Sequence, residues 1–235
     1  MTAYTLFYWS APFRGQFVRA VLAHARQTWD EAGDTAISDL MEGPVGDMPA
    51  PFMGPPILVD HDRKVAVSQT AAIILYLGET LNLLPETAGE RAMTIKIACD
   101  ANDVIDELTL DGGREMWTET AWRDFQPRLC KWMSLWEETG RRHGLSEERG
   151  GLLGEREPGI ADVVTATLWG TLIDRFPNLS ADFERCAPMT AALTRRTNAL
   201  PRLAALADKA RADYGATWSG GQIEQSLRSV LDDPD

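Results

Sequence analysis

Two adjacent prolines that lead directly into a short apolar run constrain the fold of this sequence more than any other feature. Pro55 and Pro56 precede the run 57–59, and proline, which lacks an N–H, is tolerated at the first residue of a strand or on a sheet edge. Its fixed φ, and its access to a cis bond, also suit a shaped turn. The polar residues 61–64 separate this run from a second one at 65–67. The pattern therefore predicts a β-hairpin.

Polar side chains stand where the next pattern, which is helical and apolar, begins. Ser68, Gln69 and Thr70 come directly before the apolar residues 71–78. A serine or threonine oxygen at such a position commonly caps a helix by accepting one of its free N–H groups. The N-terminus of a helix also favours an anion, so the same side chains are candidates for holding a carboxylate. The residues alone leave both interpretations open.

This succession of features resembles the signature of the glutathione S-transferases. That family has a proline, a short strand, an acidic turn and a Gln-Ser/Thr pair that opens a helix of the form Ile-x-x-Tyr-Leu, and residues 56–77 match it in order. In the family the proline is cis, and the residue before it pairs through its backbone with the cysteinyl amide of glutathione. The side chains of the Gln-Ser/Thr pair hold the γ-glutamyl carboxylate. The resemblance places these roles on Pro55, Pro56, Gln69 and Thr70.

The residues before the prolines are typical of an α/β domain. Aromatic and β-branched residues at 4–9 predict a first strand, and apolar spacing predicts a helix over 14–26. A weak strand around 29–32 and a short helix near 36–42 follow. With the hairpin and the next helix, this order is what a thioredoxin-like domain requires.

The remainder of the chain shows helical patterns only. Pro and polar residues at 81–89 predict a linker, which gives domains at 1–80 and 90–235. The predicted helices are 92–108, 118–140 (one helix, or two joined near Pro127), 160–176, 189–198 and 202–214, with a tail of uncertain order at 215–235. The helix from 160 is apolar nearly all round, so we expect it to be central. Its start, Gly159 to Asp162, resembles the family's capping motif. The predicted fold is an α/β thioredoxin-like N-terminal domain followed by an all-α domain.

Two hydroxyl groups are candidates for activating the glutathione thiol, whose thiolate is the nucleophile. A hydroxyl that donates a hydrogen bond to the sulfur favours the charged form. Tyr8, which is followed by Arg14, resembles the donor of the tyrosine-type classes and the start of a bacterial subgroup. Ser10, near Pro12, resembles the donor of the serine-type classes, with Ala11 inserted. We take Tyr8 as the donor and Ser10 as the runner-up.

Further site residues follow from the resemblance. Arg14 is a candidate contact for the glutathione carboxylates, or an electrostatic contributor to the fold. In the family, an Asp on the first long helix of the second subunit reaches the γ-glutamyl amine, a part that suits Asp103 or Asp106. Trp9, Phe13 and Trp117 are candidate contacts for an apolar co-substrate, although an aromatic side chain at helical spacing is more often part of the core.

Composition and cysteine usage exclude several classes of function. The net charge is −12 and no basic patch is visible, which argues against nucleic-acid binding. No apolar run is long enough to span a membrane, and residues 1–4 do not begin a signal peptide. Cys99, Cys130 and Cys186 are far apart, so we expect neither a zinc site nor dithiol chemistry. With three isolated histidines, no metal is predicted, and a reducing cytoplasm is the natural setting.

The resemblance implies a cytoplasmic homodimer, with glutathione as co-substrate, that joins the glutathione thiolate to a small, largely apolar electrophile in detoxification. The alternative is a binding or scaffold protein that kept the fold and lost catalysis, because a fold alone does not prove an activity. A glutathione-dependent reductase or peroxidase ranks last. Such an enzyme usually has a cysteine in the loop after the first strand, and this sequence has none there.

Overall fold

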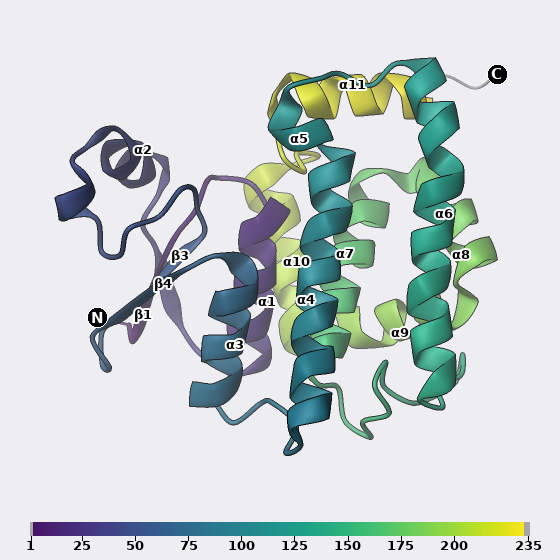
Figure 1. Cartoon of the computed structure of the whole chain (residues 1–235), viewed down its shortest axis with the longest axis horizontal. Helices are drawn as coiled ribbons and strands as arrows, with labels where there is room; N and C mark the ends of the chain where they lie inside the picture. Colours follow the sequence, from purple (N-terminus) through teal and green to yellow (C-terminus); the bar gives the residue numbers. More distant parts are fainter. Residues whose placement is uncertain (1, 233–235) are drawn as a thin grey trace.

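A four-stranded mixed sheet organises the first part of the chain. The computed structural model describes residues 2–232 (Figure 1). The sheet has the order β2-β1-β3-β4, with β1 parallel to β2 and antiparallel to β3, which in turn is antiparallel to β4. Its strands are β1 (Tyr4–Phe7), β2 (Trp29–Glu31), β3 (Ile57–Asp60) and β4 (Val65–Ser68). The predicted hairpin of β3 and β4 is confirmed.

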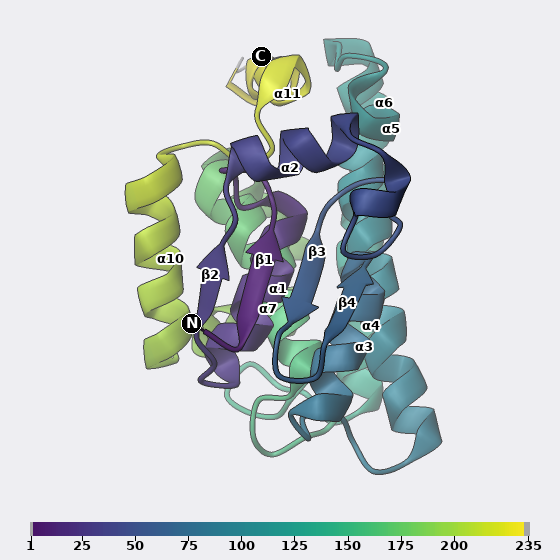
Figure 2. The same ribbon diagram turned by 90° about the vertical axis from the view of Figure 1, so that its left-hand side faces the viewer.

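Helices α1 (Phe13–His24) and α3 (Thr70–Thr80) contact each other behind this sheet. Figure 2 shows the sheet face-on, with α1 behind it and α2 (Asp34–Glu42) crossing the end where β1 and β2 finish. A 3-10 turn, η1 (Val45–Asp47), follows α2. Because α1 lies between the sheet and the second domain, nearly all of its side chains are buried.

The second domain is helical throughout its described part, as the sequence predicts. It contains α4 (Ala88–Leu108), α5 (Leu110–Gly113), α6 (Glu119–Arg142), α7 (Ile160–Arg175), η2 (Pro177–Leu179), α8 (Ser180–Cys186), α9 (Pro188–Asn198), α10 (Pro201–Tyr214) and α11 (Gly221–Asp232). Helix α7 is central: it contacts α1, α4 and α9, and most of its side chains are buried. None of the helices described is long and apolar enough to cross a membrane.

The start of α7 is held by a buried carboxylate. Asp162 is fully buried and accepts the backbone N–H of Leu152 at 2.6 Å and that of Gly159 at 2.9 Å. The second contact is the predicted capping interaction, in which the N3 side chain satisfies the N-cap N–H. Burial raises the pKa of the Asp162 carboxyl to about 6.

The structure settles two points that the sequence left open in the second domain and adds one that it did not predict. Helix α6 runs without a break through Pro127. Because proline has no N–H, the carbonyl of Arg123, four residues earlier, is left unpaired. Both residues are exposed, so water can solvate this carbonyl. The tail contains an ordered helix, α11. Cys130 and Cys186, which are 56 positions apart, form a disulfide between α6 and the end of α8, with Cα atoms 5.7 Å apart, a separation suited to such a bond.

Candidate functional site

The register of the sheet gathers the candidate residues at one end of the first domain. Phe7 pairs with Ile57, and Ile57 pairs with Ser68. The residues next to these three therefore lie at the same edge of the sheet. They are Tyr8 after β1, Pro56 before β3 and Gln69 after β4. Helices α1 and α3 begin at this edge too, so their free N–H groups and positive dipole ends are present there.

Tyr8 is held against the first turn of α1. Its side chain is buried, and its hydroxyl oxygen accepts the backbone N–H of Arg14 at 3.0 Å. Burial raises the pKa of the Tyr8 phenol to about 12, although Arg14 and Arg19 act in the opposite direction. The phenol therefore keeps its proton at neutral pH, and among the described residues that proton has no acceptor.

Gly15 makes the close approach of Tyr8 to the helix feasible. A Cβ atom at Gly15 would lie 2.3 Å from Tyr8 Cδ1 and 2.6 Å from Cγ. Carbon atoms in ordinary contact are about 3.5–4.0 Å apart. Only glycine therefore fits between the helix backbone and the phenol ring.

Tyr8 lines an open cleft of about 810 Å³ between the two domains. A cleft of this volume is large enough for a small organic ligand. Its walls come from the β1–α1 loop, the segment before the prolines, the α4–α6 connection and the residues leading into α11. The lining includes Tyr8, Trp9, Phe13, Arg14, Met53, Pro55, Gly113, Met116, Gln222 and Ile223.

An ion pair between a buried arginine and an exposed glutamate fixes the loop after Tyr8. The guanidinium of Arg19 is almost fully buried and donates to both carboxylate oxygens of Glu31, at 2.7 and 3.0 Å. It also donates to the carbonyl oxygens of Ala11, at 2.8 Å, and Trp9, at 3.4 Å. Because a bidentate guanidinium pair is geometrically specific, Arg19 and Glu31 together set the position of the loop that carries Trp9. Nothing in the sequence pattern singled out this pair.

Acidic and histidine side chains do not gather into a metal site in the part of the chain that the structure covers. The cleft instead combines a neutral phenol, an arginine and apolar side chains. Such a set suits an anionic or strongly polar ligand at the sheet edge, next to an apolar one.

Comparison with known proteins identifies the family. A family model for the C-terminal domain of glutathione S-transferase matches residues 93–230, more than half of the chain. This chain belongs to the glutathione S-transferase family. No curated protein matches the sequence.

Solved glutathione S-transferases share the whole fold. A major nematode-specific enzyme of C. elegans gives a TM-score of 0.70 at 22% identity, over 88% of this chain and 97% of that one. A Nu-class enzyme from Haemonchus contortus gives 0.68 at 20%, over 88% and 97%. The monomeric Na-GST-3 from the hookworm Necator americanus gives 0.69 at 19%, over 88% and 96%. The predicted two-domain architecture is thus confirmed, while the bacterial subtype stays a prediction.

The residues predicted to hold glutathione lie at the shared sheet edge of this glutathione S-transferase fold. The Pro55–Pro56 peptide bond is cis, Pro55 lines the cleft and Pro56 is buried. Gln69 is exposed with φ of 74°, a value that non-glycine residues rarely adopt outside strained, often functional positions. Thr70 is buried at the start of α3.

The helix-capping interpretation of this segment is wrong. Gln69 is the N-cap residue of α3, and no side chain among residues 2–232 accepts an N–H of its first turn. The first-turn N–H groups are therefore left to solvent or to a ligand. This observation favours the alternative, in which residues 68–70 hold a carboxylate.

The two candidate aspartates occupy different positions on α4. Asp106 forms an ion pair with Arg14, whose guanidinium also lies over the Phe13 ring, 4.6 Å from its centre. Asp103 is exposed and lines a surface groove beside α6 that Asp106 also lines, and it has no contact with Arg14 among the interactions of the described residues. Arg14 itself lines the cleft, so the structure brings Arg14 and Asp106 together near the candidate site and leaves Asp103 apart from it.

Like Pro56, Gln69, Thr70, Asp103 and Asp106, the predicted residues Ser10 and Trp117 do not line the cleft. Ser10 is exposed, and its backbone N–H donates to Asp34 at 2.7 Å. Trp117 is buried in an aromatic cluster of the second domain and donates its indole N–H to the carbonyl oxygen of Leu108 at 2.9 Å. Its role is packing in the core, as its spacing would also indicate.

The segment leading into α11 is the part of the cleft that sequence reasoning missed. Glu224 accepts the N–H groups of Trp218, Ser219 and Gly220, at 2.9, 2.9 and 2.6 Å, which folds the segment over the site. Trp218 packs edge-on against Phe13 with ring centres 5.0 Å apart. The apolar spacing of Ile223, Leu227 and Val230 fits a helix, and this signal would have been sufficient to predict α11, although our expectation for this segment was a tail of uncertain order.

Proposed function

We propose that this chain is a glutathione transferase that joins the glutathione sulfur to an electrophilic carbon of a small, largely apolar molecule. The observation that carries the proposal is the neutral Tyr8 hydroxyl, which accepts the Arg14 N–H and belongs to a residue in the wall of the inter-domain cleft. A phenol that keeps its proton donates a hydrogen bond to a thiolate, and this stabilises the charged form of the thiol. The thiolate then forms the S–C bond, and the leaving group departs with the electron pair.

Tyr8, rather than Ser10, is the proposed donor. Tyr8 lines the cleft, whereas Ser10 is exposed outside it, with its backbone bound to Asp34. The start of α1 adds its positive dipole end to the same location, which further favours a thiolate.

Glutathione would extend from Tyr8 along the sheet edge. The Pro55 carbonyl would accept the cysteinyl amide N–H. Gln69, Thr70 and the uncapped start of α3 would hold the γ-glutamyl carboxylate. Arg14 would contact a second carboxylate of the tripeptide, and its ion pair with Asp106 would fix the guanidinium. Asp103 and Asp106 remain the candidates for contacting the γ-glutamyl amine of glutathione that is bound to a partner subunit.

The electrophile would occupy the apolar side of the cleft. Trp9 and Phe13 lie on the first domain, and Met116 and Ile223 lie on the second. This lining supports a substrate with an apolar or aromatic body.

We also propose a cytoplasmic homodimer with domain limits at 1–80, 81–89 and 90–235. Helix α3 ends at Thr80 and α4 begins at Ala88, which supports the linker between them. Light scattering coupled to size exclusion measures the oligomeric state, and a monomer would remove the homodimer from the proposal.

Isothermal titration with glutathione tests the proposed binding site. We expect saturable binding, with a dissociation constant between about 1 µM and a few millimolar, that is lost in the Gln69→Ala/Thr70→Ala variant. Ser10→Ala serves as the matched control and should bind normally. Absence of binding by the wild-type protein at millimolar glutathione would contradict the proposal and favour a scaffold that kept only the fold.

A further inference from the structure

The backbone of Phe13 has a conformation that a phenylalanine rarely adopts. Its φ is 25°, a positive value that glycine tolerates and bulky side chains disfavour. Such a residue persists only where its surroundings hold it in place, and this often occurs at functional positions. Phe13 begins α1 and lies in the wall of the cleft. The contacts that hold Phe13 therefore affect the geometry of the candidate site.

Phe13 controls the direction of the N–H that binds Tyr8. The peptide group between Phe13 and Arg14 carries this N–H, which the Tyr8 hydroxyl oxygen accepts at 3.0 Å. Because a peptide group is planar and rotates as one unit, the direction of the N–H depends on the backbone torsions of Phe13. A change in those torsions would turn the N–H away from the phenol oxygen. The position of the Tyr8 hydroxyl thus depends on whatever holds Phe13.

Trp218, near the other end of the sequence, holds Phe13 by two contacts. Its carbonyl oxygen accepts the Phe13 N–H at 3.2 Å, and the two rings pack edge-on with centres 5.0 Å apart, an arrangement that aromatic pairs favour. Trp218 also packs edge-on against Phe176, and it is only 3% exposed. It does not line the cleft itself. Trp218 can therefore influence the site only through the residues that it contacts.

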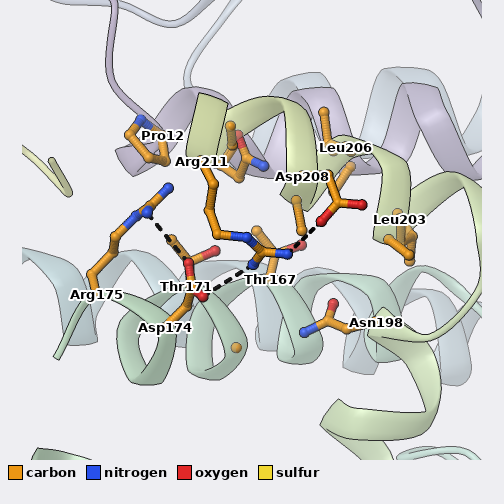
Figure 3. A pocket seen from close by; sticks show the side chains of 16 residues that line it. Pro12, Thr167, Thr171, Asp174, Arg175, Asn198, Leu203, Leu206, Asp208 and Arg211 are labelled. Atoms are coloured by element: carbon orange, nitrogen blue, oxygen red, sulfur yellow. Dashed lines mark hydrogen bonds and ion pairs between the residues drawn. The ribbon is translucent and has the colours of Figure 1, made fainter. Parts of the chain in front are cut away.

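The segment that carries Trp218 is anchored at its start by the end of α7. Arg175 donates to the carbonyl oxygen of Gly215 at 2.5 Å. Its guanidinium also pairs with Asp174 at 3.4 Å, and Asp174 pairs with Arg211 of α10 at 3.0 Å. Figure 3 shows these charged side chains directed toward one another between α7 and α10. The start of the segment is therefore tied to both helices.

A buried carboxylate anchors the end of the same segment. Glu224 of α11 accepts the backbone N–H of Trp218 at 2.9 Å and pairs with Arg228 at 2.6 Å. Arg228 also donates to the carbonyl oxygens of Arg175, at 3.0 Å, and Ala216, at 2.5 Å. Hydrogen bonds that involve a charged partner are stronger than neutral ones. The segment is thus fixed at both ends, and the Trp218 ring and carbonyl are fixed with it.

We propose that Trp218 is a positioning residue for the thiol-activating group. It holds Phe13 so that the Arg14 N–H meets the Tyr8 hydroxyl oxygen, which leaves the phenol proton for the glutathione sulfur. The inference rests on the proposed function, because it concerns the same Tyr8 hydroxyl. It gives the segment before α11 a part in thiol activation, in addition to its place in the wall of the cleft.

The pKa of the glutathione thiol in the complex without electrophile tests this role. The ultraviolet absorbance of the thiolate, followed against pH, gives this pKa. Trp218→Leu removes the ring that packs on Phe13 and should raise the thiol pKa by at least about 0.5 unit. Trp218→Phe keeps an aromatic ring there and should restore most of the lost shift. The dissociation constant of glutathione should stay nearly unchanged, because Gln69 and Thr70 are untouched.

Trp136→Leu is the matched control. Trp136 is also 3% exposed and packs edge-on against another aromatic ring, that of Trp169, but it belongs to α6, which contributes no residue to the cleft wall. Its loss should lower the free energy of unfolding and leave the thiol pKa unchanged. If Trp218→Leu does not fold, Glu224→Ala releases the Trp218 N–H while keeping the ring, and it should raise the thiol pKa in the same direction.

The possible failures are distinguishable. If the wild-type complex has a lowered thiol pKa and folded Trp218→Leu or Glu224→Ala has the same value, the role of Trp218 is overturned and the proposed function stands. An equal rise of the thiol pKa in Trp136→Leu would also overturn this role, because the effect would then follow from lost stability alone. A wild-type complex whose thiol keeps the ordinary pKa of about 8.5 would contradict the proposed function, and the role of Trp218 with it.

Discussion

Replacing Gly15 by alanine should disable the site while leaving the fold in place. The added methyl carbon would lie 2.3 Å from Tyr8 Cδ1, against the 3.5–4.0 Å of an ordinary carbon contact. The phenol ring must therefore retreat by about 1 Å or more. A shift of this size removes the 3.0 Å hydrogen bond between the Arg14 N–H and the Tyr8 oxygen and moves the hydroxyl away from the glutathione sulfur.

Two opposing terms set the stability of Gly15→Ala. Alanine within a helix is favoured over glycine by about 1 kcal/mol, and overpacking costs about 1–3 kcal/mol. The free energy of unfolding should therefore fall by no more than about 2 kcal/mol. A hydrogen bond to a charged group contributes about 1.5–3 kcal/mol, so we expect kcat/KM to fall roughly 10- to 150-fold.

Steady-state conjugation of glutathione to a chromogenic aryl halide, with urea unfolding in parallel, measures both effects. Gly89→Ala is the matched control, because it also lies in a helix and its added methyl group would meet nothing within 4 Å. It should be neutral or slightly stabilising, with unchanged kcat/KM. If Gly15→Ala retained kcat/KM within twofold of the wild-type protein, the assigned role of Tyr8 against α1 would be refuted.

Three further perturbations test the fold and the loop at the site. Arg19→Met removes the ion-pair partner of Glu31 and leaves the carbonyl oxygens of Ala11 and Trp9 without their donor. The free energy of unfolding should therefore fall by about 1–3 kcal/mol, and kcat/KM should fall with it. A double-mutant cycle with Glu31→Gln that gives no coupling would contradict this. Reduction, or a Cys130→Ser/Cys186→Ser variant, should lower the free energy of unfolding by about 2–4 kcal/mol, and thiol titration of the denatured, unreduced protein should count one thiol rather than three. Burial raises the pKa of Asp162 from 3.8 to about 6, so the stabilisation from its protonated carboxyl is complete below pH 3.8 and is lost as the pH rises through 6. The free energy of unfolding, measured relative to Asp162→Asn, should therefore fall by up to about 3 kcal/mol between pH 4 and 7. A free-energy difference between the two proteins that does not change with pH would disprove the pKa shift.

Local patterns were sufficient to predict the secondary structure that carries the site. The prolines and apolar runs at 55–67 predicted the β3–β4 hairpin, and the predicted helix over 92–108 is the body of α4. Both depend on side-chain periodicity and on the geometry of proline, which act within a few residues. The same locality explains why Tyr8 and Pro55, which line the cleft, could be named as candidates from the sequence.

Features that depend on tertiary contacts were missed. The Arg19–Glu31 pair joins α1 to β2, and the Cys130–Cys186 disulfide joins α6 to α8, so neither has a spacing signal. The role of α11 depends on Glu224 folding residues 218–220 over the cleft. Sequence alone also left open whether residues 68–70 cap their helix, and what speaks against capping is that no side chain among the described residues bonds to the first turn of α3.

Ionisation of the bound glutathione thiol tests the central claim most directly. The ultraviolet absorbance of the thiolate, followed against pH in the wild-type, Tyr8→Phe and Ser10→Ala proteins, gives the pKa of the thiol in each complex. We expect this pKa to lie well below the ordinary thiol value of about 8.5 in the wild-type and Ser10→Ala complexes, and to rise by at least one unit in Tyr8→Phe. An equally low pKa in Tyr8→Phe, or a rise in Ser10→Ala instead, would contradict the assignment of Tyr8 as the thiolate donor.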